Sequence, residues 1–162
     1  MNTIVVVDKN WGIGNGNRLL THIPGDLKYF KEKTLNKVVV MGRETFESLP
    51  GKNPLPNRTN IVLSRNSDFT AENCIVCRSM GQLFKELENF DTEDVFIAGG
   101  ENIYKQFLPY CSSFFVTRMD QSFEADRYFE NLDRREDLKL VWESELREEK
   151  GVTYKFTEYR RK

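Results

Sequence analysis

The sequence has few of the side chains that bind metals or form disulfides: one histidine, His22, and three cysteines, Cys74, Cys77 and Cys111. A zinc site built on the Cys74-x-x-Cys77 pair needs a second pair of ligands, which the rest of the sequence does not supply. The pattern of residues 74–77 is typical of a short strand, which would send the two thiols to opposite faces. We therefore expect no metal site and no redox-active pair.

The sequence also has no block of like charges and no long apolar run. Its 24 lysines and arginines are balanced by 25 acidic residues, so nothing indicates a nucleic-acid or membrane partner. The apolar run at residues 4–7 is too short for a signal peptide or a membrane span. We expect a cytoplasmic protein in which residues 1–162 form one domain.

Short β-rich runs alternate with helical patterns along most of the chain. Apolar runs of this kind are typical of strands covered on both faces, and the alternation predicts a mostly parallel sheet with right-handed crossovers. Near the C-terminus, two runs follow one another without a helix between them, which predicts an antiparallel pair. The fold class is therefore α/β: a single-domain mixed, mostly parallel sheet of about eight strands, with helices on both faces and an antiparallel C-terminal strand. The expected strands are 4–7, 38–41, 60–63, 74–77, 95–98, 114–117, 138–142 and 152–156, and the expected helices are 24–33, 43–49, 79–88 and 101–108.

One acidic side chain lies where an apolar one is expected. Pro24 suits the first turn of a helix, and in that helix Asp26 shares a face with Leu27 and Phe30, which should face inward. An acid on an apolar face is costly without a partner, so Asp26 is a candidate for a shifted pKa and for proton chemistry. The alternative is an acid that only stabilises the helix N-terminus.

Glycines, hydroxyls and cations recur where the expected strands end. The pair Gly99-Gly100 joins a strand to a helix, and paired glycines let a ligand approach the backbone closely. Because the carboxyl ends of parallel strands meet at one edge of a sheet, these groups together favour a phosphate-rich ligand. Each of them alone is typical of a turn or a solvated surface residue. The other members of the set are Gly42, Arg43, Thr45, Ser64, Arg65 and Arg78.

Two loops differ from simple connections. Residues 10–18 contain three glycines, Gly12, Gly14 and Gly16, and predict either a mobile lid or a surface turn. Residues 50–58 are rich in proline, which stiffens the segment, and they end in the cation Arg58.

Six motifs span nearly the whole chain: Gly12-Ile13-Gly14, Pro24-x-Asp26-Leu27-x-x-Phe30, Met41-Gly42-Arg43-x-Thr45-x-x-Ser48-Leu49, Leu55-Pro56-x-Arg58-x-Asn60, Gly99-Gly100-x-x-Ile103-Tyr104 and Glu124-x-Asp126-x-x-Phe129. In order and spacing they closely resemble the dihydrofolate reductase family. A single motif would be weak evidence, whereas a full set in register is specific.

The resemblance implies an enzyme of one-carbon metabolism that reduces 7,8-dihydrofolate to 5,6,7,8-tetrahydrofolate by hydride transfer from NADPH. It implies that Asp26, hydrogen-bonded by Thr117, holds the amino-pyrimidine edge of the pterin and promotes protonation of a ring nitrogen by water. It also implies a monomer that diaminopyrimidine antifolates inhibit. The substrate contacts so implied are Val5, Val6, Asp26, Leu27, Phe30, Leu49, Leu55, Arg58, Ala98, Tyr104 and Thr117. The cofactor contacts so implied are Val6, Ile13, Gly14, Asn17, Leu19, Gly42, Arg43, Glu44, Thr45, Leu63, Ser64, Arg65, Arg78, Ala98, Gly99, Gly100, Glu101, Asn102, Ile103 and Tyr104.

Several positions depart from the usual pattern of that family. Leu20-Thr21 stand where relatives usually carry Pro-Trp, a change that bears on substrate protonation and on closure of the lid. Ala98 replaces a larger aliphatic residue, Asn102 an arginine of some relatives, and Arg127 a small polar residue.

Two other functions stay open at this point. A pyrimidine reductase of riboflavin synthesis shares the fold, although its substrate lacks the glutamate tail that Arg58 would bind. A non-catalytic domain, disabled by the change at Thr21, would bind NADPH without turning over dihydrofolate.

Overall fold

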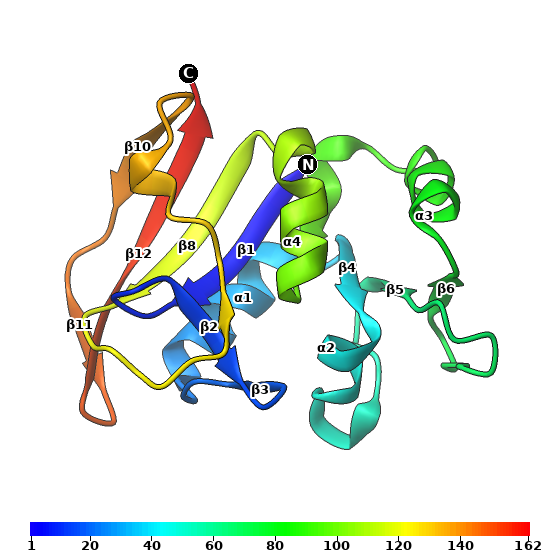
Figure 1. Ribbon diagram of the computed structural model, residues 1–162, viewed down its shortest axis with the longest axis horizontal. Helices are drawn as coiled ribbons and strands as arrows, with labels where there is room; N and C mark the ends of the chain where they lie inside the picture. Colours follow the sequence, from blue (N-terminus) through cyan, green and yellow to red (C-terminus); the bar gives the residue numbers. More distant parts are fainter.

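A mixed sheet runs through the centre of the computed structural model, which describes residues 1–162 (Figure 1). Its strands lie in the order β10-β12-β8-β1-β7-β4-β5-β6, with β11 added beside β12. Neighbouring strands from β8 to β6 are parallel, whereas β12 is antiparallel to both β8 and β10, so the predicted mixed sheet is confirmed. The strands are β1 (Asn2–Val7), β4 (Val38–Gly42), β5 (Thr59–Leu63), β6 (Ile75–Cys77), β7 (Val95–Ile97), β8 (Ser113–Met119), β10 (Leu138–Glu143), β11 (Arg147–Glu149) and β12 (Val152–Arg161).

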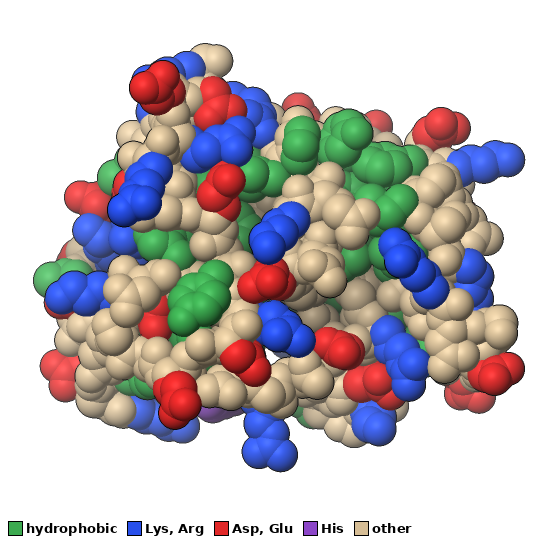
Figure 2. Space-filling model, viewed as in Figure 1, with side chains coloured by type: hydrophobic (Ala, Val, Ile, Leu, Met, Phe, Trp, Pro, Cys, Tyr) green, Lys and Arg blue, Asp and Glu red, His purple; other side chains and the backbone are tan.

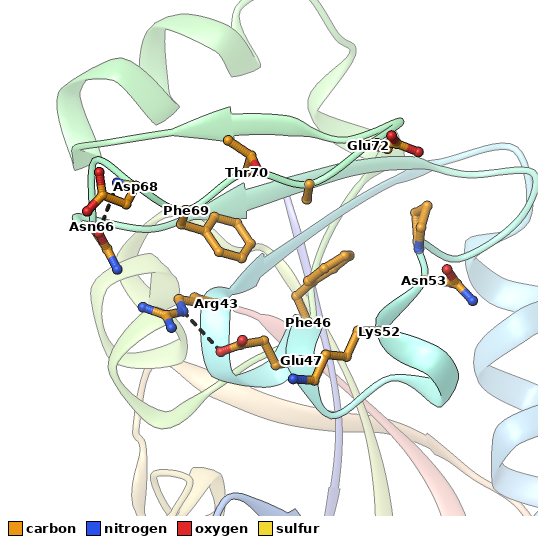
Figure 3. A pocket seen from close by; sticks show the side chains of 12 residues that line it. Arg43, Phe46, Glu47, Lys52, Asn53, Asn66, Asp68, Phe69, Thr70 and Glu72 are labelled. Atoms are coloured by element: carbon orange, nitrogen blue, oxygen red, sulfur yellow. Dashed lines mark hydrogen bonds and ion pairs between the residues drawn. The ribbon is translucent and has the colours of Figure 1, made fainter.

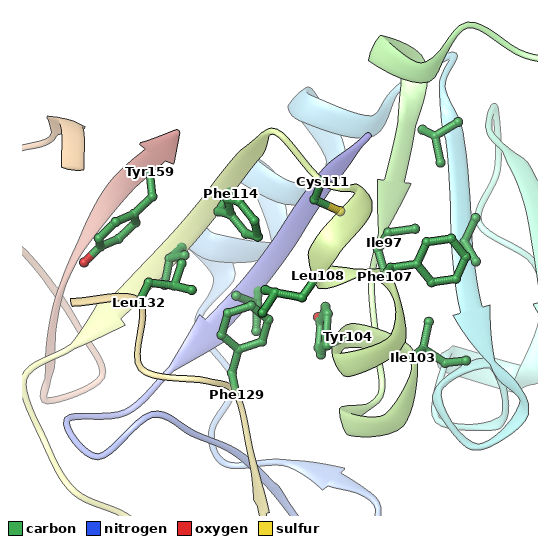
Figure 4. Packing of buried hydrophobic residues seen from close by; sticks show 14 of the residues in the cluster. Ile97, Ile103, Tyr104, Phe107, Leu108, Cys111, Phe114, Phe129, Leu132 and Tyr159 are labelled. Carbon is green, nitrogen blue, oxygen red and sulfur yellow. The ribbon is translucent and has the colours of Figure 1, made fainter. Parts of the chain in front are cut away.

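Alternation of side chains along β4 explains why helices cover both faces of this sheet. Val38 and Val40 join the hydrophobic core on the side of α3 and α4, whereas Val39 and Met41 join a second cluster with Phe46 of α2. Figure 4 shows the first core, in which side chains of α4 pack above the central strands. The helices are α1 (Pro24–Thr34), α2 (Arg43–Glu47), α3 (Met80–Leu87) and α4 (Glu101–Phe107), with short 3-10 turns at Pro50–Lys52, Thr92–Asp94, Leu108–Tyr110 and Leu132–Arg134.

The helix starts follow the sequence closely. Ser79 caps α3 because its hydroxyl accepts a hydrogen bond from the Gln82 N–H at 3.1 Å.

The second helix is shorter than predicted. It ends at Glu47, and the expected continuation to residue 49 is wrong because the chain turns there into the 3-10 segment that begins at Pro50.

The glycine-rich segment 10–18, for which the sequence predicts a mobile lid or a surface turn, contains two short strands. It forms β2 (Gly12–Asn15) and β3 (Arg18–Leu19), which build a small second sheet with β9 (Arg127–Tyr128). The buried carboxylate of Asp8 fixes the start of the segment, because it accepts hydrogen bonds from the N–H groups of Asn10, Gly12 and Phe123. The segment is therefore more than a surface turn, and its role as a lid stays a prediction.

On the surface, acidic and basic side chains are interspersed on the face that Figure 2 shows, in keeping with the nearly neutral net charge. The edge strand β10 leaves Leu140, Val141 and Trp142 exposed. No helix has the length and apolar character that crossing a bilayer requires.

Candidate active site

Asp26 and Thr117 meet as the sequence predicts. Asp26 lies in the first turn of α1, and Thr117 lies on β8 beneath it; the Thr117 hydroxyl donates a hydrogen bond of 2.6 Å to Oδ1 of Asp26. Burial raises the pKa of Asp26 to about 6, and the hydrogen bond from Thr117 partly opposes that rise. The second oxygen, Oδ2, has no partner within the protein, so it is the atom with which a ligand can bond.

The inward face of α1 is narrower than the sequence predicts. Asp26 and Phe30 are partly buried and Thr34 is fully buried, whereas Leu27 is 41 % exposed. The expectation that Leu27 faces the core is therefore wrong. Residues spaced by four form the buried stripe, and Leu27 lies one position to its side, without a partner in the core.

Apolar side chains from three segments converge beside this helix. Phe30, Leu49 and Leu55 are partly buried and pack, together with Ala98, on the cluster around Met41. These predicted substrate contacts therefore come together, in an arrangement suited to a flat ring system with one apolar face.

Arg58 is held in place at the end of the proline-rich loop. Its Nε donates to the carbonyl of Pro56 at 3.0 Å and its Nη1 to the hydroxyl of Thr34 at 3.2 Å, which leaves Nη2 without a protein partner. Burial lowers the pKa of this guanidinium. Sequence reasoning missed the supporting role of Asn60, whose buried amide pairs with the backbone of Leu55 and Arg58.

Pairing between the central strands β1 and β7 ends early, after Thr3 and Ile97. Val5 and Val6 on β1 and Ala98 after β7 follow this point, which is where a ligand can reach the backbone of both strands. Tyr104 of α4 is buried behind them, and its hydroxyl donates to the Ile4 carbonyl at 2.8 Å. Burial raises the pKa of Tyr104, so this residue acts as a fixed hydrogen-bond donor.

The diglycine forms a tight junction between β7 and α4. The Gly99-Gly100 peptide is cis, and the Gly99 carbonyl accepts a hydrogen bond of 2.9 Å from the N–H of Gly42. Gly99 has a φ of +118°, a conformation that only glycine adopts readily. This contact places both predicted cofactor turns side by side, with Thr45 next to them.

Two of the three predicted phosphate-binding arginines already have partners. Arg43 pairs with Glu47 at 3.0 Å and lies 5.6 Å from the Phe69 ring, in a hollow of about 470 Å³ beside α2 (Figure 3). Arg78 donates to the carbonyls of Asn66 and Phe69 at 2.5 and 2.6 Å, so it holds the loop after β5. The sequence gives no sign of these hydrogen bonds, because every residue has a backbone carbonyl and residue types do not show which carbonyl lies near Arg78.

Arg65 is the free cation of the three. It is exposed and makes no ion pair, and the preceding Ser64 is buried. Of the other predicted cofactor contacts, Ile13, Leu63 and Glu101 are partly buried, Gly14 and Ile103 are buried, and Asn17, Leu19, Glu44 and Asn102 are exposed.

The structure explains only some of the positions at which the sequence departs from the family pattern. Leu20 packs against the cluster around Ile23, and Thr21 is partly exposed. The Arg127 side chain reaches only the carbonyl of Asp126, at 3.4 Å, and nothing in the structure explains its charge. Asp126 itself joins the small sheet through its carboxylate, which accepts from the N–H of Gly16 at 3.1 Å.

Together, this fold and site define an α/β protein of the kind that binds small molecules at strand ends, with glycine turns and a free cation near one carboxyl group whose pKa burial raises to about 6. Comparison with known proteins makes the assignment specific. The family model for dihydrofolate reductase matches residues 1–161, and the chain belongs to the dihydrofolate reductase family.

Individual relatives agree over nearly their full lengths. Dihydrofolate reductase of Neisseria meningitidis serogroup A is 38% identical over 156 residues, which is 96% of this chain and 91% of the relative. The Bacillus subtilis enzyme is 35% identical over 160 residues, 98% of this chain and 93% of the relative. A solved structure of dihydrofolate reductase from Enterococcus faecalis, complexed with NADP(H) and RAB-propyl, superimposes with a TM-score of 0.87 at 32% identity and covers 99% of this chain and 95% of that one.

Proposed function

We propose that Asp26 and Thr117 form the centre at which this chain reduces 7,8-dihydrofolate to 5,6,7,8-tetrahydrofolate. The reaction and its cofactor, NADPH, follow from membership of the family. The observation that carries the residue assignment is the bond between Asp26 and Thr117, together with the raised pKa of that acid.

In this proposal the Oδ2 oxygen of Asp26 receives the amino-pyrimidine edge of the pterin. Thr117 occupies Oδ1, which fixes the plane of the carboxylate, and the partner-free Oδ2 faces the ligand. A carboxyl group with a pKa of about 6 exists in both protonation states near neutral pH, so it can favour protonation of the pterin ring by water. NADPH, when bound, supplies the hydride.

The substrate side is completed by apolar walls and one cation. Phe30, Leu49 and Leu55 form the wall beside Asp26, and Leu27 covers the outer side of the ring system. Val5 and Ala98 offer backbone carbonyls to the pterin amino group. Arg58 binds a carboxylate of the glutamate tail through its free Nη2.

Replacing Arg58 by leucine is expected to raise the KM for dihydrofolate by about 10- to 100-fold, because a charge-assisted bond of roughly 1.5–3 kcal/mol is lost. The kcat is expected to change little, since the tail lies away from the reacting ring. Steady-state kinetics test this, with a reduced pterin that lacks the glutamate tail as the control substrate. Equal losses for both substrates would show that Arg58 acts only through the loop it holds.

The cofactor side fits a phosphate-bearing dinucleotide. The backbone is partly exposed at Gly42 and Gly100, with the buried Gly99 between them in space, and Arg65 is a free cation just after a neighbouring strand. We propose that these groups hold NADPH and that Arg65 contacts its 2′-phosphate.

Arg65→Ala is expected to weaken NADPH binding about tenfold, as loss of one charge-assisted contact of roughly 1.4 kcal/mol implies. Binding of NADH is expected to stay unchanged, because NADH lacks the 2′-phosphate. Fluorescence titration measures both, and Arg134→Ala, which removes another exposed cation that has no ion pair, is the matched control. A parallel loss for NADH would assign Arg65 to another part of the cofactor.

The remaining features of the proposal follow the family. Residues 1–162 act as one domain, the chain works as a cytoplasmic monomer, and diaminopyrimidine antifolates compete with dihydrofolate. The decisive test follows NADPH absorbance with and without dihydrofolate. Turnover supports the reductase; NADPH binding without turnover would favour a non-catalytic domain, and turnover only with a riboflavin-pathway pyrimidine would favour that reductase.

A further inference from the structure

The helix that carries Asp26 lacks a local N-terminal cap. Ile23 occupies the cap position and has no side-chain acceptor, although its carbonyl receives the N–H groups of Asp26 and Leu27. The N–H of Gly25 is satisfied from a distant part of the sequence instead: it donates a hydrogen bond of 2.7 Å to Oε1 of Glu149, 124 residues away. A charged acceptor therefore stands at the helix terminus that favours negative charge.

Glu149 is itself held in position. It ends β11, where it pairs with Val152 of β12, and its Oε1 also accepts the hydroxyl of Tyr154 at 2.8 Å. Gly25 has to be glycine for this contact, because a Cβ there would collide with both Glu149 Oε1 and the Tyr154 hydroxyl. The glycine and the glutamate thus form one close-packed joint between the β11–β12 hairpin and α1.

We propose that Glu149 is a positioning residue for the reduction of dihydrofolate. It fixes the backbone at Gly25, while Thr117 fixes the side chain of the next residue, Asp26. The two anchors come from β11 and β8, so they hold the first turn of α1 against two parts of the same sheet. This inference rests on the proposed role of Asp26.

A small movement at this joint has a direct kinetic consequence. The carboxylate of Asp26 must meet a planar edge of the substrate, and a displacement of about 1 Å can cost on the order of a hundredfold in rate. Without Glu149 the Gly25 N–H bonds to water and the first turn gains freedom, whereas the strands and α4, which carry cofactor contacts, keep their own bonds.

The test compares Glu149→Ala and Glu149→Gln with Glu148→Gln, a control at the exposed neighbouring residue, whose side chain has no bond within the protein. For Glu149→Ala we expect kcat/KM for dihydrofolate to fall about tenfold. This is less than the roughly hundredfold loss for a displacement of about 1 Å, because Thr117 still holds the side chain of Asp26. The affinity for NADPH should be unchanged. Glu149→Gln keeps an oxygen that accepts from Gly25 and Tyr154, so it should restore most of the loss, and Glu148→Gln should match the wild type.

The outcomes separate the possible roles of Glu149. A Glu149→Ala protein that is less heat-stable but has wild-type kcat/KM would overturn the inference and leave Glu149 as a stabilising cap alone. Equal losses in dihydrofolate turnover and NADPH affinity would also overturn it, because they would show general damage. If the Ala variant does not fold, Glu149→Asp, which shortens the side chain and withdraws Oε1, must show the same selective loss. A wild type without turnover would instead overturn the proposed function.

Discussion

Asp26→Asn is expected to lower kcat/KM for dihydrofolate at pH 7 by about 10²- to 10⁴-fold, the usual range for loss of a group that assists proton transfer. An amide keeps the shape of the side chain, and its oxygen still accepts the hydrogen bond from Thr117. What it loses is the ability to take up and release a proton, with which Asp26 assists protonation of the pterin ring nitrogen. The affinity for NADPH should be unchanged, because none of the proposed cofactor contacts involves Asp26.

The pH profile distinguishes this role from a simple binding defect. With a pKa of about 6, the carboxyl group of Asp26 loses its proton as the pH rises through about 6, so wild-type turnover should fall above that pH. In Asp26→Asn this dependence should be absent, and any residual rate should grow toward acid pH only as the substrate becomes protonated in solution. Wild-type turnover by the variant at neutral pH would remove Asp26 from the mechanism.

Thr117→Val provides a graded control for the same site. The Thr117 hydroxyl lowers the pKa of Asp26 in opposition to burial, so its removal should move the alkaline fall of the pH profile to higher pH. A profile that moves the opposite way would contradict the assigned hydrogen bond.

Elements with a strong local pattern were predictable from the sequence, and elements fixed by distant contacts were not. The apolar run around Val39 predicts a buried strand in any context, and β4 confirms it. By contrast, β2 has glycines at alternate positions and exists because Asp8 and β9 hold it. One of its two pairing partners, β3, follows directly in the sequence, but the other, β9, lies more than a hundred residues along the chain, where periodicity carries no information.

In the site, too, features with a local sequence pattern were predictable and features that depend on distant contacts were not. Asp26 was detectable because a carboxylate conflicts with its apolar neighbours, and conflicts of this kind mark functional positions. The restraint from Glu149 was not detectable, since a glutamate in an exposed, charged hairpin is ordinary. The sequence also could not show that the guanidinium of Arg78 already has hydrogen-bond partners, because these partners are backbone carbonyls.

The same replacement, Asp26→Asn, is expected to stabilise the protein at neutral pH while it removes activity. The pKa of Asp26 rises from 3.8 to about 6 on folding, so folding takes up a proton between these pH values. The contribution of Asp26 to stability is therefore complete below pH 3.8 and is lost as the pH rises through about 6. Two pKa units correspond to an upper limit of about 3 kcal/mol, because one unit is worth roughly 1.4 kcal/mol.

Thermal unfolding of the wild type and Asp26→Asn between pH 4 and pH 8 measures the stability that is lost when Asp26 ionises in the folded protein. The difference in melting temperature should be smallest near pH 4 and should widen to at most about 6–12 °C above pH 7, as this free energy implies for a chain of this size. Asp137→Asn is a control of opposite sign: Arg135 holds the pKa of Asp137 down to about 2, so its removal should not stabilise the protein at any of these pH values. Equal stability of wild type and Asp26→Asn at pH 8 would mean that Asp26 is solvated in solution, and its raised pKa could then not explain the alkaline fall in turnover. A widening difference would show that the fold tolerates an unfavourable buried charge at the position where its reaction needs a group that can be protonated.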